Sequence, residues 1–325
     1  MAGFEVPWVE KYRPTCLDEI VGNERVVQQL RSLASQGNMP NLILVGPPGC
    51  GKTSTVMCLA TNLLADKMKE AMCEMNASDD RGIDVVRERI KAFAQKKVQL
   101  PSNSHKIVIL DEADSMTTAA QQALRMIMSD YTATTRFALA CNDSSKIIEA
   151  IQSRSAILRF TRLNDEEVMH RLLHVVRSEA LEADRKGLEA LVFTAEGDMR
   201  QAINNLQATA AGFGRVSFEG VFLVCDQPHP DIIKDIIGYC LQRKFNEAAQ
   251  RLEVLWVQGY SPFDIMGQIY KVASTFEMPE PVHLAVMKEL AVVRMRLLDG
   301  VCTLLQLHGA LARLCEVTKV DPGRN

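Results

Sequence analysis

A glycine-rich loop followed by a lysine and two hydroxyl residues is the first group in this chain that could do chemistry. The loop reads Gly46-Pro47-Pro48-Gly49-Cys50-Gly51-Lys52-Thr53-Ser54, and its first eight residues fit G-x-x-x-x-G-K-[ST]. Glycines let backbone N–H groups turn toward phosphate oxygens, and a helix that starts there adds its positive end. Lys52 is expected to reach the β- and γ-phosphates of a nucleotide, and the Thr53 hydroxyl to ligate Mg²⁺. Because an apolar run precedes the loop and a helical pattern follows it, the pattern predicts a nucleoside triphosphate site rather than a plain glycine turn.

A second group of polar residues follows two further apolar runs. Asp111 and Glu112 come directly after the run 106–110, and Asn142 follows the run 136–141. Asp111 would hold the Mg²⁺ ion through its water shell, while Glu112 would orient and polarise the attacking water. Asn142 can hydrogen-bond that water or the γ-phosphate. Two acids can also simply cap a strand, and asparagine there is often a turn residue, but the upstream loop favours the catalytic interpretation.

The elements that position these residues follow from the apolar pattern. The runs 41–45, 106–110 and 136–141 are short and continuous, which indicates strands buried on both faces of a parallel sheet. Ligands of such sheets bind at the carboxyl ends of the strands, where the polar residues fall. Residues 166–225 have helical periodicity, Pro228-His229-Pro230 breaks it, and residues 231–318 are helical again. We therefore predict an α/β parallel-sheet domain at 1–165, a small helical domain at 166–228 and an all-α domain at 229–325.

The composition narrows the class of protein. The 325 residues are 47% hydrophobic and 24% charged, with a formal net charge of −3, which is typical of a soluble globular protein. No apolar run approaches the roughly 20 residues that span a bilayer, so no membrane contact is expected, and residues 1–14 do not resemble a secretory signal. The nine cysteines form no C-x-x-C pair, so we expect small buried side chains rather than a zinc ribbon or a disulfide framework. A slightly acidic protein that touches DNA must use a local basic strip.

The order and spacing of the motifs resemble those of AAA+ ATPases, and further segments resemble the small subunits of replication factor C. These segments are 7–14 (PWVEKYRP), 18–23 (DEIVGN), 76–82 (NASDDRG), 153–155 (SRS) and 197–200 (GDMR). The resemblance implies a RecA-like domain, a helical lid and a helical collar. It also implies ATP with Mg²⁺, assembly with other replication factor C subunits into a nuclear heteropentamer, and the opening of the sliding clamp, proliferating cell nuclear antigen, for loading at primer–template DNA.

The same resemblance assigns roles to individual residues. Val9, Arg13 and Val21 are expected to contact the base. Arg200 is expected to sense the γ-phosphate in its own chain, and Arg154 to act in trans on the ATP of a neighbouring subunit. Either arginine could instead cap helix carbonyls or form a surface ion pair, whereas beside a phosphate a guanidinium offers a bidentate fork.

Contact with DNA is expected at a basic strip. Its candidates are Arg87 and Lys91 along one helix, Arg81 near the start of that helix, and Arg125 on another helix. The alternative is a solvated helix face. Met126 stands where a second arginine is usual in the family, and Ser155 and Cys50 replace a usual cysteine and threonine.

Two other functions remain open at this point: a related motor of the branch-migration or origin-recognition kind, and a scaffold subunit that binds nucleotide without turnover.

Overall fold

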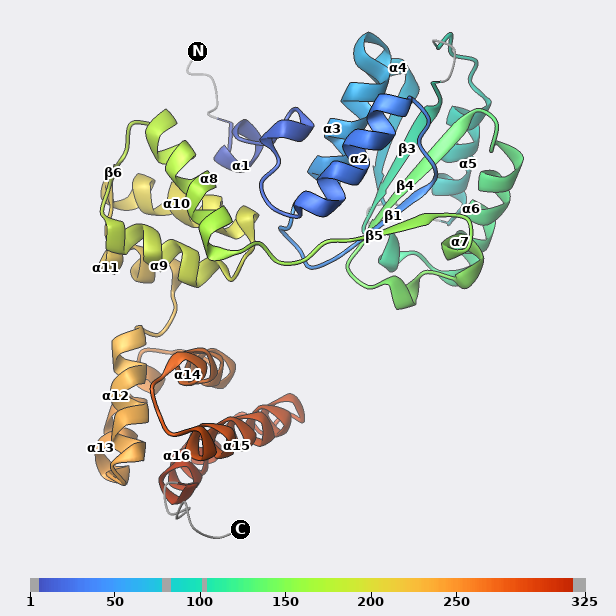
Figure 1. Cartoon of the computed structure of the whole chain (residues 1–325). Coiled ribbons are helices and arrows are strands. Elements are labelled where there is room, and N and C mark those ends of the chain that lie inside the picture. The colour runs from blue at the N-terminus through green and yellow to red at the C-terminus, as the bar shows by residue number, and fades with distance from the viewer. Residues whose placement is uncertain (1–5, 78–82, 101–103, 318–325) are drawn as a thin grey trace. The chain divides into compact units, whose positions relative to one another are not determined.

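The computed structural model of the chain describes residues 6–77, 83–100 and 104–317 (Figure 1). The chain folds into two compact units, Met1–Val221 and Phe222–Asn325, and each is described by itself. The boundaries that we predict at 165 and 228 are finer than this division and stay predictions.

A five-stranded parallel sheet forms the centre of the first unit, in the order β2-β3-β4-β1-β5. The three predicted strands are present as β1, β4 and β3, so the expected α/β class is confirmed. The sequence pattern missed β2 and β5, because both lie at the sheet edges, where side chains are partly exposed and no continuous apolar run is needed. The bounds are β1 Leu42–Val45, β2 Met72–Asn76, β3 Lys106–Asp111, β4 Thr135–Cys141 and β5 Ala156–Arg159.

Successive side chains of the central strands alternate between two cores, one on each face of the sheet. Leu42 and Leu44 pack with α2 and α3, whereas Ile43 and Val45 pack with α5, α6 and α7. This period of two is the geometry of a strand. The helices are α2 Glu24–Gln36, α3 Lys52–Leu64, α4 Met68–Ala71, α5 Ile83–Gln95, α6 Thr118–Asp130 and α7 Glu149–Gln152.

The lid, which follows β5 in the same unit, is helical as expected. Helix α8 begins at a capping box, in which the Asn164 and Glu167 side chains satisfy each other's backbone N–H groups. Helix α10 begins at Asp198, whose carboxylate accepts from the backbone N–H of Gln201 at 3.0 Å. The lid elements are α8 Asp165–Ser178, β6 Glu182–Ala183, α9 Arg185–Ala195, α10 Met199–Phe213 and β7 Arg215–Val216. The first unit also contains the short N-terminal helix α1 Trp8–Lys11, and helix α11 Phe218–Cys225 crosses the boundary between the two units.

Beyond the end of α11, the described part of the second unit contains five helices, which form a core of their own. Buried side chains from all five helices, such as Ile236, Leu252, Ile269, Leu290 and Leu311, form one cluster. The helical pattern is broken near its C-terminal end at Gly300, which has φ of +93° and follows the end of α15. The helices are α12 Pro230–Leu241, α13 Phe245–Val257, α14 Pro262–Thr275, α15 Glu280–Leu298 and α16 Leu304–Val317.

Two expectations from composition can be compared with the structure. None of the helices in the described ranges is long and apolar enough to cross a membrane. Cys50, Cys58, Cys141 and Cys240 are buried as expected, and Cys73, Cys225 and Cys315 are partly buried, but Cys16 and Cys302 are exposed. The expectation was wrong for these two, because Cys16 directly precedes a short 3-10 turn (Leu17–Glu19) and Cys302 lies in the connection between α15 and α16.

Candidate nucleotide site

The glycine-rich loop connects the carboxyl end of β1 to the first residue of α3. At Gly46, a Cβ atom would lie 2.5 Å from the carbonyl oxygen of Phe160. Gly49 has φ of +67°, and a Cβ there would lie 1.8 Å from the Asp198 carboxylate. Any larger residue would push the loop away from β5 or from the lid. The glycines therefore keep the backbone N–H groups close to the start of α3, as a phosphate cradle requires.

The Lys52 side chain lies beneath this loop and is only 8% exposed. Its Nζ donates to the carbonyl oxygens of Gly46 at 2.8 Å and Pro47 at 2.7 Å, and to Oδ1 of Asn142 at 3.1 Å. All three acceptors are neutral, so the ammonium charge has no anionic partner among these contacts. Phosphate oxygens would supply the anion, and the contact with Asn142 brings together two of the predicted site residues.

Thr53 and Asp111, the two predicted ligands of Mg²⁺, lie side by side. The Thr53 hydroxyl donates to Oδ2 of Asp111 at 2.8 Å, and Oδ1 of Asp111 accepts from the backbone N–H of Glu112 at 2.9 Å. A hydroxyl and a carboxylate are hard oxygen donors of the kind that Mg²⁺ prefers, so these residues fit the ion. When bound, Mg²⁺ would supply positive charge to the phosphate oxygens.

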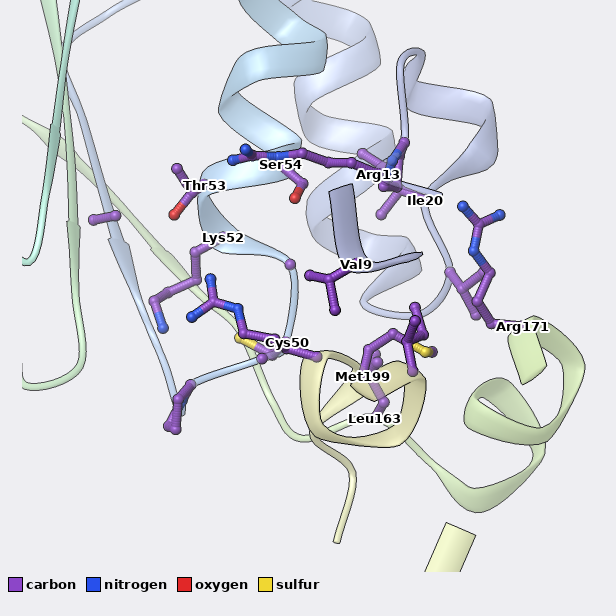
Figure 2. A pocket seen from close by; sticks show the side chains of 18 of the residues that line it. Val9, Arg13, Ile20, Cys50, Lys52, Thr53, Ser54, Leu163, Arg171 and Met199 are labelled. Carbon is purple, nitrogen blue, oxygen red and sulfur yellow. The ribbon is translucent and has the colours of Figure 1, made fainter. Parts of the chain in front are cut away.

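One pocket joins these groups to the N-terminal segment, 7–14 (Figure 2). Gly46 and Pro47 do not line it; they form the backbone that accepts from Lys52. The sequence-predicted residues that do line it are Val9, Arg13, Val21, Pro48, Gly49, Cys50, Gly51, Lys52, Thr53, Ser54, Asp111, Glu112, Asn142 and Arg200. The structure thus brings the loop, the acids, Asn142, Arg200 and the expected base contacts to one place.

Several lining residues had not been singled out from the sequence. Ile20 lies within the segment 18–23 and Met199 within 197–200, so each belongs to a motif that could have drawn attention to it. Leu163 and Ile203 add apolar side chains to the lining of the pocket. Arg171 is different, because it is one charged residue of α8 with no motif around it. Its role could not be read from local sequence.

The two cysteines that line the pocket are not candidates for nucleophilic catalysis. Burial raises the pKa of the Cys50 thiol above its ordinary value, and burial together with nearby Asp114 raises the pKa of Cys141 to about 11. Both thiols therefore stay protonated near pH 7, and the thiolate is the reactive form. The chemistry of this pocket rests on its carboxylates, hydroxyls and cations.

Comparison with known proteins identifies the family. A model of the ATPase family associated with various cellular activities (AAA) matches residues 42–163, and a model of the replication factor C C-terminal domain matches residues 228–313. Replication factor C subunit 2 of Arabidopsis thaliana is 56% identical over 312 residues, covering 96% of this chain and 94% of the relative. Replication factor C subunit 4 of Oryza sativa subsp. japonica is 55% identical over 314 residues, covering 97% and 94%. This chain belongs to the replication factor C family.

Membership in the replication factor C family confirms the expected class, an ATPase subunit of the clamp-loader kind, and does not favour the alternative motors. The RuvB Holliday junction branch migration motor of Thermotoga maritima aligns with a TM-score of 0.55 over 70% of this chain and 79% of that chain. Its sequence identity is 18%, so the likeness concerns the fold alone.

Arg154 of this replication factor C chain does not line its own pocket. It lies between α7 and β5, at the edge of the sheet, and its side chain is exposed. The guanidinium donates to the carbonyl of Ala150, one turn back, at 2.8 Å. This contact has the geometry expected of an arginine that caps helix carbonyls. The position of Arg154 at the sheet edge is also compatible with action in trans, so the in-trans role stays a prediction.

The candidate DNA contacts are described only in part. Arg81 lies outside the described residues, and Arg87 lies on α5 but its side chain is outside them as well. Lys91 is exposed on α5, and α5 packs beside α6, which carries the half-buried Arg125. The Nε of Arg125 is shielded from solvent and has no hydrogen-bond partner among the described residues. The DNA-binding assignments of all four residues stay predictions.

Proposed function

We propose that this replication factor C chain binds ATP with Mg²⁺ in the pocket and hydrolyses it as one subunit of a nuclear heteropentamer. The complex would open the sliding clamp, proliferating cell nuclear antigen, and load it on primer–template DNA. The observation that carries the proposal is the meeting of Lys52, the Thr53–Asp111 pair and Glu112 in one pocket. A scaffold subunit without turnover would have no need of the full set.

Each residue has a role that its chemistry allows. Lys52 would bind the β- and γ-phosphates, and Thr53 and Asp111 would hold the Mg²⁺ ion. Glu112 is exposed at the end of β3, where its carboxylate can polarise the attacking water. Asn142 would help to orient that water, and Arg200, the second residue of α10, would reach the γ-phosphate from the lid.

The apolar end of the pocket would bind the adenine. Val9, Arg13 and Val21 line this end together with apolar side chains of the lid. Aliphatic side chains can sandwich an aromatic base, while nearby backbone groups supply hydrogen bonds. The N-terminal segment is therefore the proposed base-binding element.

The second unit would form the collar that holds the ring together. Large apolar side chains lie exposed on it, including Leu298 at 72%, Leu305 at 79% and Val257 at 85% exposure. Exposed apolar residues mark a protein–protein contact where they gather into a patch, and the proposed collar would bury these residues against neighbouring subunits. The lid, proposed at 166–228, would connect the collar, proposed at 229–325, to the ATP site.

Co-purification combined with kinetics tests the proposal. The chain should associate with four related AAA+ chains, and clamp plus primed DNA should stimulate ATP hydrolysis of the complex. A purified chain that binds no ATP, or a complex whose turnover ignores clamp and DNA, would overturn it.

A further inference from the structure

We infer that Arg171 is a positioning residue, which holds the base-binding N-terminal segment, 7–14, on the lid and thereby sets the affinity for the adenine part of ATP. The inference rests on the proposed function, since it presumes that the pocket binds ATP. It assigns a role to a residue far from the phosphates and outside every motif described above.

The central contact joins the lid to the backbone of the N-terminal segment. Nη2 of Arg171, on α8, donates to the carbonyl oxygen of Tyr12 at 2.5 Å. Arg171 lines the same pocket as Val9 and Arg13, and Figure 2 shows its side chain extending from the lid helix. A hydrogen bond to a backbone carbonyl fixes the peptide unit between Tyr12 and Arg13. Fixing this peptide unit also sets the orientation of Val9 and Arg13, the proposed base contacts of the segment.

Further contacts fasten the same segment to the lid. The Tyr12 hydroxyl and the Lys11 ammonium both donate to Oε1 of Glu179, each at 2.6 Å. The backbone N–H of Trp8 donates to Oε1 of Gln207, on α10, at 3.0 Å, and the Trp8 side chain is buried. The segment is therefore attached to the lid by several hydrogen bonds, although it lies at the start of the chain.

At its far end, the segment meets the helix that follows the phosphate loop. The Cys58 thiol of α3 donates to the carbonyl oxygen of Pro14 at 3.2 Å. The segment thus runs from the lid to α3 and bridges the two sides of the pocket. A base bound against it would be sensitive to how the lid holds the segment.

Arg171 suits this task by its chemistry. The guanidinium is half-buried, and burial lowers its pKa, while nearby Glu19 opposes that shift. A charged donor to a carbonyl makes a stronger hydrogen bond than a neutral pair. Loss of the guanidinium would leave the Tyr12 carbonyl without this donor and free the segment to shift.

Titration calorimetry on the full chain tests the inference with two ligands, ATP and inorganic tripolyphosphate, both with Mg²⁺. Arg171→Ala should raise the Kd for ATP about tenfold, the effect of losing one charge-assisted hydrogen bond. The Kd for tripolyphosphate should stay unchanged, because that probe has no base. Arg177→Ala is the matched control, since Arg177 is an exposed arginine on the same helix; it should change neither constant.

The possible outcomes separate the inference from the proposed function. Equal weakening of ATP and tripolyphosphate would overturn the positioning role, because it would indicate phosphate contact or general damage. An unchanged Kd for ATP would overturn it too. Should Arg171→Ala fail to fold, Glu179→Gln weakens a separate contact between the same segment and the lid and should also weaken binding of ATP alone. Wild-type chain that binds tripolyphosphate but shows no preference for ATP would remove the inference and leave the phosphate site standing.

Discussion

At the scale of single residues, the polar groups of the nucleotide site already form hydrogen bonds with one another. A bound nucleotide would replace some of these partners with its own phosphate oxygens. Lys52 already donates to three oxygens, and Thr53 donates to Asp111. Phosphate oxygens would offer the Lys52 ammonium charged acceptors in place of neutral ones. Such charge-assisted bonds are about twice as strong as neutral ones, so the exchange favours binding.

The first prediction at this scale concerns Lys52. Lys52→Ala should raise the Kd for ATP with Mg²⁺ by about 100-fold, because the cation nearest the β- and γ-phosphates is lost. Titration calorimetry on the full chain measures this Kd. Lys91→Ala, which removes an exposed lysine outside the pocket, is the control and should leave the Kd unchanged. Equal Kd values for Lys52→Ala and wild type would refute the assignment of the loop.

The second concerns Glu112. Glu112→Gln should preserve ATP binding but slow hydrolysis at this site by about 10²–10⁴-fold, because an amide of the same shape cannot act as a base. Single-turnover kinetics of a complex mutated in this chain alone would isolate the site. A normal rate at that site would count against the catalytic role.

At the scale of elements, one buried lysine terminates a helix that carries two candidate DNA contacts. Lys106 begins β3, is 4% exposed, and donates to the carbonyl oxygens of Phe93, Ala94 and Lys96 at the end of α5. A cation there donates to the last carbonyl oxygens of the helix, which have no partner within the helix, and it complements the negative end of the helix dipole. Lys106 thus ties the sheet to α5.

Removing that cap should loosen α5. Lys106→Met keeps the length of the side chain but leaves the carbonyls without their donor, so unfolding should become easier by about 1–3 kcal/mol. Urea denaturation of the full chain measures this change, and hydrogen exchange should report it at the last turn of α5. Lys91→Met, at an exposed position on the same helix, should change stability by no more than about 0.5 kcal/mol. Matching stabilities for both variants would show that Lys106 does not cap α5.

At the scale of the whole molecule, the question is what each unit contributes to an assembly. The nucleotide pocket is lined entirely by residues of the first unit, and the second unit has its own core. Binding of ATP and assembly of the ring should therefore be separable.

Truncation after Gln227, before α12, should separate them. The fragment should remain folded by circular dichroism and bind ATP with an unchanged Kd, yet fail to co-purify with the other subunits. Co-expression with the partner chains provides the assay. Recovery of the fragment in a stable complex would rule out the collar assignment.

Arg154 gives a prediction that only an assembly can test. Arg154→Ala should leave this chain's own Kd for ATP unchanged, since Arg154 does not line its pocket. Hydrolysis at the adjacent subunit's site should fall by roughly 10³-fold, the lower range for arginines supplied in trans. The assay uses a complex in which only the neighbour's site is competent for hydrolysis. Normal turnover there, with a stability loss of about 1 kcal/mol or less, would leave Arg154 as the helix cap seen against Ala150.

The sequence alone determined the class of the protein and the phosphate end of its site. Residues 46–54 are contiguous and run from the end of a buried strand into the first turn of a helix, so their geometry follows from local backbone rules. The central strands were predictable because strands buried on both faces must be apolar throughout. The edge strands β2 and β5 escaped notice because that constraint is relaxed at a sheet edge.

Only the tertiary structure decided which distant residues meet. Lys52 and Asn142 are 90 positions apart, and Arg171 and Tyr12 are 159 positions apart, yet each pair is joined by a hydrogen bond. No local period or spacing encodes such a meeting, because it depends on how the lid packs beside the sheet and on how the N-terminal segment docks on that lid. In the sequence, Arg171 cannot be told apart from the other polar residues of an amphipathic helix. Its position beside a backbone carbonyl is a product of packing, which sums many weak contacts over the whole unit.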